Sequence, residues 1–332
     1  MRDLYNLHEF YSNSKSSKQL TNRRKSFGYQ VLGFGSGGAA AFVYNDEGIF
    51  GYGGTPGKTA VTNKVSNSGV VATDTSGVGT ARSHVAATQY GGDKAIFGFG
   101  NTPSKTAITN LVSNSGVVAS DVAGVGTARS GLAACSYDSL DKGIFGYGEV
   151  APSPYTSSLS NKISNVGVVA SDVAGVGSAR YLIAACEFGG DKGIFAYGYG
   201  PGHAWPAISN IVSNTGVIAS DVSNSSTGKQ NPAGCSYGGD KGIFGYGYKA
   251  SGPSVSTTSL VTNLGVIGSD VSGVGTARDA LGACEYGQGK GIFAYGGGPT
   301  AVSNLVSDVG VVSADVSGVG TARQELKGCS YN

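Results

Sequence analysis

A six-residue string of the type Gly-Ile-Phe-Gly-Tyr-Gly recurs six times along this chain of 332 residues, at intervals of 47 to 50 residues. The copies begin at Gly48, Ala95, Gly143, Gly193, Gly242 and Gly291. A fixed period of this length is the signature of a repeat architecture, in which each repeat is one supersecondary unit that buries its apolar face against its neighbours. The sequence therefore predicts six equivalent units.

Each repeat has the pattern of four short strands joined by turns. The first is a string of small residues such as 132–137, the second is the Gly-Ile-Phe string, and the third and fourth are typified by 107–113 and 116–122. Asn and Gly between alternating apolar runs mark antiparallel hairpins. The 57 glycines suit strands that converge on an axis and approach one another closely. We predict an all-β, six-bladed β-propeller over 37–332, with four antiparallel strands per blade.

The ends of the repeat series indicate how the ring closes. Strings of the first-strand type number seven, because 39–44 begins the series and 325–331 ends it with no second strand after it. A propeller must protect the edges of its sheets. We expect 326–331 to pair with 48–53, so that both ends of the chain share one blade, with 39–44 displaced or competing for the same place.

Residues 1–36 lie outside the repeats and form a basic arm of net charge +4. Its cations are Arg2, Lys15, Lys18, Arg23, Arg24 and Lys25, against Asp3 and Glu9. Such a segment buries too little apolar surface to fold alone and is expected to order on a partner. We interpret it as an anchor to another subunit of an assembly; a solvated tail without a partner is the alternative.

One cation closes the string Gly-Val-Gly-Thr-Ala-Arg in each repeat, and an aspartate stands eight residues before it. The cations are Arg82, Arg129, Arg180, Lys229, Arg278 and Arg323, and the aspartates are Asp74, Asp121, Asp172, Asp221, Asp270 and Asp315. A structural salt bridge within or between blades explains the pattern. A ring of binding cations on one face of the propeller is the alternative.

Five cysteines, Cys135, Cys186, Cys235, Cys284 and Cys329, take one equivalent position in five repeats. We expect them to be reduced thiols that act as small buried apolar residues. A metal ring near the axis is the alternative, but metal-ligand spacing and supporting histidines are missing from the sequence. No metal and no cofactor are predicted.

The loops after the second strand differ most between repeats, which makes them candidates for binding. The fourth contains His203 and Trp205, the one tryptophan of the chain. An exposed tryptophan suits sugar stacking or a protein-binding hot spot. Local packing against Pro201 and Pro206 is the alternative.

Catalysis finds little support in the sequence. The three histidines, His8, His84 and His203, do not recur with a nucleophile, and Gly33–Gly38 is not followed by the βαβ pattern of a dinucleotide site. Neither an apolar run of membrane-spanning length nor a secretory signal is expected. We predict a binding or scaffolding protein rather than an enzyme, without nucleic acid or membrane insertion.

The repeats resemble the kelch type of propeller repeat. Arg129, the string 132–137 and the run 141–146 follow that family's order, and they are similar to kelch-like units in virion proteins of tailed phages, whose N-termini resemble Tyr29–Gly38. The resemblance covers about residues 29–332. It implies a structural protein of the virion, in the tail, fibre or adhesion apparatus, assembled in the host cytoplasm and binding other virion proteins through the arm. A host glycan or protein is the second partner it suggests. A stand-alone carbohydrate-binding propeller is the alternative, and a propeller glycosidase is a third.

Overall fold

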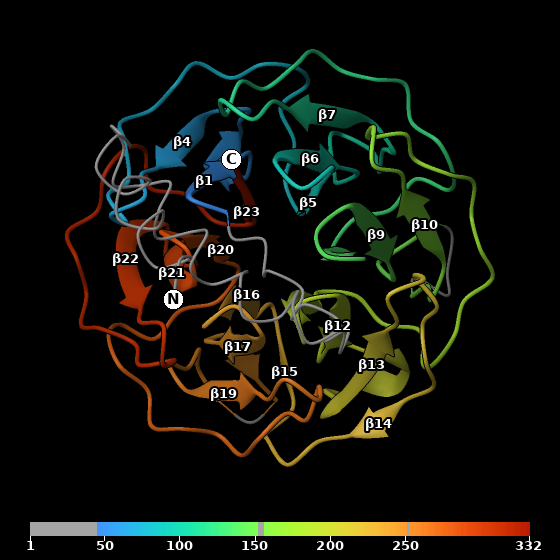
Figure 1. The fold of residues 1–332 in the computed structure, drawn as a ribbon, viewed down its shortest axis with the longest axis vertical. Helices are drawn as coiled ribbons and strands as arrows, with labels where there is room; N and C mark the ends of the chain where they lie inside the picture. The colour runs from blue at the N-terminus through green and yellow to red at the C-terminus, as the bar shows by residue number, and fades with distance from the viewer. Residues whose placement is uncertain (1–44, 152–155, 251) are drawn as a thin grey trace, which may run out of the picture. The chain divides into compact units, whose positions relative to one another are not determined.

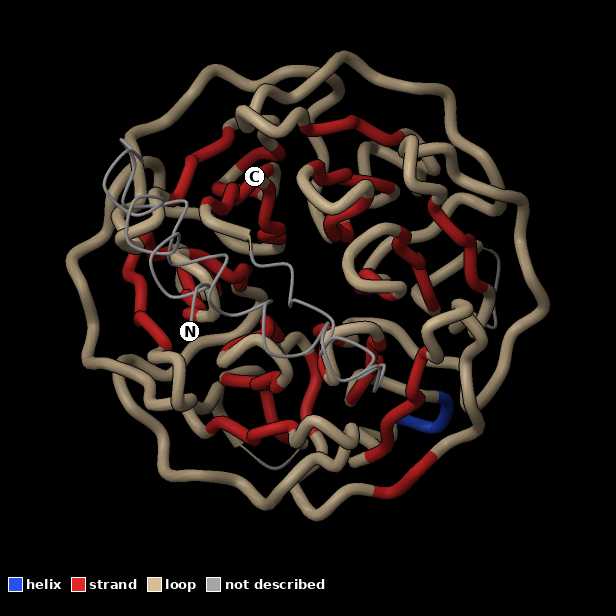
Figure 2. The backbone as a smooth tube through the Cα atoms, viewed as in Figure 1, coloured by secondary structure: helices blue, strands red, loops and turns tan. Residues whose placement is uncertain are grey.

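The chain forms small antiparallel sheets, six of them with three or four strands (Figure 1). The computed structural model describes residues 45–151, 156–250 and 252–332, all of which belong to one compact unit, Phe42–Asn332. Figure 2 shows the strands surrounded by long connecting loops. The fold is all-β, as predicted, and is consistent with a β-propeller-like arrangement.

Each of the six larger sheets contains one copy of the Gly-Ile-Phe string, in the strand that we call the middle strand. The first strands are β5 (Ala86–Tyr90), β8 (Ala133–Tyr137), β11 (Ala184–Phe188), β16 (Ala233–Tyr237), β20 (Gly282–Tyr286) and β23 (Lys327–Tyr331). The middle strands are β6 (Lys94–Gly98), β9 (Lys142–Gly146), β12 (Lys192–Ala196), β17 (Lys241–Gly245), β21 (Lys290–Gly296) and β1 (Glu47–Gly51). The third strands are β7 (Thr109–Val112), β10 (Ser160–Ile163), β13 (Ile208–Val212), β19 (Thr258–Val261), β22 (Thr300–Val306) and β4 (Thr62–Val65).

The first strands lie beside one another in chain order. β5 contacts β8, and the contacts continue through β11, β16, β20 and β23, which in turn contacts β5. A series of backbone hydrogen bonds follows the same order, with N···O distances of 2.7–3.0 Å. Each amide donates to the equivalent carbonyl in the preceding repeat, and the series returns to its starting residue. Its members are His84, Gly131, Leu182, Asn231, Ala280 and Glu325.

The C-terminal strand completes the sheet that the first middle strand begins. β23 pairs with β1 in antiparallel register, with Ile49 opposite Cys329 and Gly51 opposite Lys327. This confirms the expected pairing of 326–331 with 48–53. The competing segment, 39–44, lies outside the described residues, as does the whole of the predicted arm, 1–36.

The prediction of a regular fourth strand in every unit was wrong. Only β14 (Val222–Ser223) is a fourth strand in the described residues; elsewhere that segment makes isolated bridges. In the first repeat Thr62 pairs with Thr75 and Val65 with Val71, so one extra residue stands between the two pairs. Such an extra residue bulges and interrupts the ladder. The side-chain amide of Asn63 compensates by donating to the free carbonyl of Ala72.

The remaining elements are short. β2 (Gly54–Thr55) pairs with β3 (Gly57–Lys58), and β15 (Lys229–Gln230) pairs with β18 (Tyr248–Lys249). The 3-10 turn η1 (Pro201–His203) is the only helical segment of the described residues, none of which form a helix able to cross a membrane.

Aromatic residues fill the space between neighbouring sheets. The phenylalanine of each middle strand packs edge-on against the aromatic residue that follows the middle strand of the preceding sheet, as Phe97 does against Tyr52 at 5.2 Å. The other pairs are Phe145–Phe99, Phe195–Tyr147, Phe244–Tyr197, Phe293–Tyr246 and Phe50–Tyr295. All these side chains are buried, so the core is divided among the contacts between sheets.

Deleting residues 325–332 removes β23 and should leave the edge of β1 unpaired. An open strand edge is a template for association with other chains, so we expect aggregation or a large fall in melting temperature. Differential scanning calorimetry and light scattering measure both. Thermal unfolding equal to that of the full chain would show that β23 is dispensable for closure.

Candidate functional site

The six repeated cations are buried between the sheets. The five arginines and Lys229 have at most 1% of their surface exposed. Each lies over the aromatic ring that follows the middle strand of the preceding sheet, as Arg82 does over Tyr52, with 4.2 Å from the guanidinium carbon to the ring centre. The aromatic face therefore meets the cation while the ring edge is contacted by phenylalanine.

Hydrogen bonds satisfy most of these guanidinium groups from within the cation's own sheet. Arg278 donates from Nε to the carbonyl of Tyr295 and from Nη2 to the side-chain oxygen of Asn304, at 2.8 and 2.7 Å. Arg82, Arg180 and Arg323 repeat both bonds. Arg129 donates a hydrogen bond only to Asn161; its Nε and Nη1 have no hydrogen-bond partner among the described residues, although Nη1 lies 3.8 Å from Asp172. Burial lowers the pKa of Arg129 to about 10.

The carboxylate partner also belongs to the cation's own sheet and follows its third strand in the chain. Arg82 lies 3.8 Å from Asp121, and Arg180 lies 3.6 Å from Asp221. Asp74, eight residues before Arg82, instead accepts hydrogen bonds from Thr321. Burial alone would raise the pKa of Asp121, but hydrogen bonds from Thr80 and Asn110 outweigh it and lower the pKa. These contacts favour the structural salt bridge over a ring of binding cations.

The fourth repeat departs from this pattern at two positions whose side chains contact the same aspartate, Asp270. Lys229 replaces the arginine, and Ser259 replaces the asparagine that holds the guanidinium group elsewhere. Lys229 still approaches Asp270, at 3.6 Å, and Ser259 donates to the same carboxylate. Burial lowers the pKa of Lys229 to about 8, although Asp270 opposes the shift. The two substitutions form a matched pair.

Transferring this pair to the next repeat tests the interaction. We expect Arg278→Lys and Asn304→Ser each to lower the free energy of unfolding by about 1–3 kcal/mol, because each leaves a buried polar partner without its hydrogen bond. The double variant should lose less than the sum, with a coupling of about 1 kcal/mol or more. Denaturant unfolding of all four proteins measures the cycle. Additive losses would contradict a specific Arg–Asn contact.

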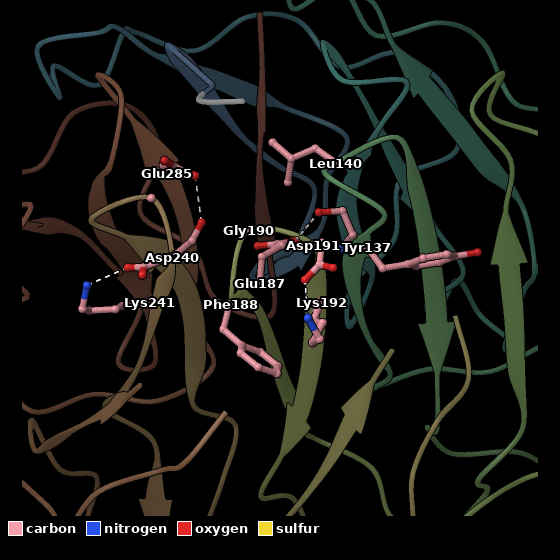
Figure 3. Close-up of a pocket in the computed structure, with 13 residues that line it drawn as sticks. Tyr137, Leu140, Glu187, Phe188, Gly190, Asp191, Lys192, Asp240, Lys241 and Glu285 are labelled. Carbon is pink, nitrogen blue, oxygen red and sulfur yellow. Dashed lines mark hydrogen bonds and ion pairs between the residues drawn. The ribbon is translucent and has the colours of Figure 1, made fainter. Parts of the chain in front are cut away.

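A series of cavities lies among the first strands. One is lined by Ser136, Glu187 and Glu285 with the turns that hold Asp191 and Asp240 (Figure 3). The second cavity has Glu187 and Glu285 in common with the first. The third has six alanine or glycine residues in common with the second. The fourth has Lys327 in common with the third, so the four cavities form a continuous series. We call this series the lumen. One end lies at the turns between first and middle strands, and the other at the starts of the first strands.

Polar side chains form one layer of the lumen, at the fourth residue of each first strand. Serine alternates there with a carboxylate or amide; the residues in order are Gln89, Ser136, Glu187, Ser236, Glu285 and Ser330. Ser136 donates from its amide and its hydroxyl to Glu187, at 2.8 and 2.9 Å, and Ser236 donates to Glu285 at 2.8 Å. Oε1 of Glu285 is buried without a partner in the described part of the chain.

Burial raises the pKa of both carboxyl groups above the ordinary value. It raises the pKa of Glu187, against the hydrogen bonds from Ser136. It raises the pKa of Glu285 to about 8, and the charge of Glu187 adds to the shift while the bond from Ser236 opposes it. Glu285 is therefore mostly protonated at neutral pH. Among the described residues, no three His, Cys, Asp or Glu side chains gather to hold a metal ion.

Glu285→Gln should alter how stability depends on pH. The folded-state pKa of Glu285 lies above the ordinary value of 4.5, so its contribution to stability is full below about pH 4.5 and is lost as pH rises through about 8. Glutamine resembles the protonated acid, so the variant should be more stable than the parent by about 1–3 kcal/mol at pH 9 and equal to it at pH 4. Chemical unfolding measures this. Asp308→Asn, at an exposed position, is the control; a constant difference across pH would refute the assignment.

The five cysteines are buried and unpaired, in agreement with their predicted structural role. They occupy the third position of each first strand except β5, where Thr88 replaces them. Burial raises the pKa of all five thiols. They are therefore inert as nucleophiles.

The end of the lumen where the first strands start has the most varied residues of the repeats. The mouth of the lumen is lined by the six residues of the cyclic hydrogen-bond series. We call them the mouth ring: His84, Gly131, Leu182, Asn231, Ala280 and Glu325. All have a positive φ of 52–61°, although five are not glycine. That conformation costs about 1 kcal/mol per residue, so the ring holds chemically different side chains in a strained backbone. His84 and Glu325, which are neighbours in the ring, pair through their side chains at 3.0 Å.

The variable loops lie beside the segments that lead into the mouth ring. Ser83 bridges Asn101 and Tyr181 bridges Tyr199, which confirms that the two loop sets share a face. Trp205 packs edge-on against Tyr199 at 5.0 Å, and Tyr199 against Tyr181 at 5.4 Å. Trp205 is half-buried, and its packing partner is an aromatic residue. The side chain of His203 lies outside the described part.

The sequence analysis missed Glu187, Glu285 and Lys327. Each stands where other repeats have a small neutral residue. Ser136 and Ser236 occupy the repeat position of Glu187 and Glu285, and Ala133 occupies that of Lys327. Comparing the repeats position by position for charged departures would have found all three. No family model matches the chain, and no similar protein is found among curated proteins.

Proposed function

We propose that the chain is a closed six-bladed β-propeller that serves as a rigid, non-catalytic interaction platform. The pairing of β23 with β1 supports closure, as does the cyclic series of hydrogen bonds in the mouth ring. The buried cation in each contact between sheets supports rigidity, because its partners come from two sheets at once.

The observation that carries this proposal is the contrast between the two ends of the lumen. At one end, the turns repeat an Asp–Lys pair, such as Asp191–Lys192 and Asp240–Lys241. At the other, the mouth ring and the loops around it differ in every repeat. Repeated residues serve the common fold, whereas variable residues on a rigid frame are suited to binding. The variable end is the binding face.

The place of this platform is a tailed-phage virion, in the tail, fibre or adhesion apparatus. The similarity of the repeats to kelch-like units of virion proteins supports this assignment, together with the basic segment that precedes them. In this arrangement the arm anchors the protein to another virion subunit, and the binding face meets a host surface glycan or protein. Assembly takes place in the host cytoplasm.

A carbohydrate-binding propeller that acts alone is the second candidate. The aromatic group of Tyr181, Tyr199 and Trp205 favours it, because it occurs in one repeat and serves no repeated structural contact. Aromatic rings pack against the apolar faces of sugars, and the polar edges of such rings bond hydroxyl groups. The indole Nε1 of Trp205 is buried without a hydrogen-bond partner among the described residues, so the support for this candidate is the aromatic surface of the group.

Deleting residues 2–28 separates the candidates. Anchoring predicts a normally folded propeller that no longer joins its particle, measured by circular dichroism and by sedimentation of assembled particles. Replacing the six arm cations with glutamine is the matched control, since it keeps the length and removes the charge. Normal incorporation of the truncated chain would defeat the anchor. Glycan binding with no particle association in either form would favour the second candidate.

A further inference from the structure

One lysine stands alone in the wall of the lumen. The cavity at the level of the first two residues of the first strands is lined by 11 residues, and all except Lys327 are alanine or glycine. Lys327 occupies the position that Ala86, Ala133 and Ala184 take in other repeats. Replacing a methyl group with an aminobutyl chain at one of six equivalent positions serves no repeated contact. Its use must therefore be particular to this strand.

The amine of Lys327 has no partner in the described structure. It makes no hydrogen bond and no ion pair, whereas the turn lysines Lys94, Lys142, Lys192 and Lys241 each pair with an aspartate. The side chain is half-buried and touches the space of the lumen, and this burial lowers the pKa of the Lys327 amine to about 8. An amine without a counter-charge in apolar surroundings is unfavourable unless something binds it.

The surroundings restrict what can reach this amine. Lys327 lines two small cavities, one otherwise made of alanine and glycine and the other, at the mouth, of mainly apolar side chains with His84, Asn231 and Glu325. A single amine offers one positive charge and up to three donors. The ionisable groups at the mouth are His84 and Glu325, which pair with each other and make no hydrogen bond or ion pair with Lys327. A compact monoanion matches this charge and this width, whereas a bulky or multiply charged group does not.

We propose that the mouth ring admits a carboxylate group, which binds the amine of Lys327 inside the lumen. The carboxylate belongs either to a small free acid or to an acidic side chain or chain end of a partner. The site does not depend on the virion role, since it requires only the lumen and its lysine. The mouth ring, with a different side chain in each repeat, selects what enters.

The test uses the full chain with sodium acetate, a capped Gly-Asp-Gly peptide and acetamide as a neutral isostere of acetate. Lys327→Ala restores the residue of the other repeats and should fold; Lys327→Met keeps the length without the charge. Lys290→Ala, at an exposed position on β21, is the matched control. Binding is measured by calorimetry and by nuclear magnetic resonance of ¹³C-labelled acetate.

We expect acetate, the peptide or both to bind the parent and the Lys290→Ala protein equally, and acetamide to bind neither. Affinity should fall by at least about tenfold in both Lys327 variants, as expected on losing a charged hydrogen-bond partner. Binding of acetate alone identifies a free acid as the ligand, and binding of the peptide identifies a partner's side chain. Equal affinity in the Lys327 variants, or no binding of either carboxylate to the parent, would overturn the proposal.

Discussion

The structure depends on a buried cation in each contact between neighbouring sheets. Taking a guanidinium group out of water is costly unless its donors are satisfied. Here the aromatic ring comes from one sheet, while the carbonyl, the asparagine and the aspartate come from the next, as around Arg82. The accepting carbonyl belongs to an aromatic residue with positive φ, such as Tyr295 at 64°. The cation thus stabilises a strained backbone and joins two sheets in the same contact.

Periodicity predicted much of this fold because each repeat contains its own local signals. Turn glycines, the aromatic middle strand and the surplus C-terminal string were sufficient to place the sheets and the pairing of β23 with β1. The fourth strand could not be predicted, because a bulge depends on the register between two segments. Two residues stand between Thr62 and Val65, but three stand between their partners Val71 and Thr75. Likewise, the spacing of aspartates and cations left open whether the salt bridges form within or between blades, whereas packing pairs Arg82 with Asp121.

The candidate site was predicted less well, for a physical reason. A search for motifs singles out what recurs, and recurring residues here build the contacts between sheets. The side chains with free chemical capacity are departures from the repeat: Lys327 among alanines, Glu285 among serines, and Trp205 in a single loop. A side chain that occurs in one repeat only does not find the hydrogen-bond partners that the repeated residues have in every sheet. Polar groups without a hydrogen-bond partner therefore occur at such positions.

The mouth ring combines a strained backbone of positive φ with a different side chain in each repeat, and the surrounding sheets explain why both are possible. A residue such as Leu182 or Ala280 does not hold a positive φ without outside constraint. The constraint is the hydrogen bond from each ring amide to the preceding ring carbonyl, together with the fixed position of the sheet behind it. Because both involve only the backbone, the side chain at each ring position is free to vary without loss of fold. A rigid ring of sheets therefore allows the mouth of its lumen to change chemically while the rest of the repeat stays the same.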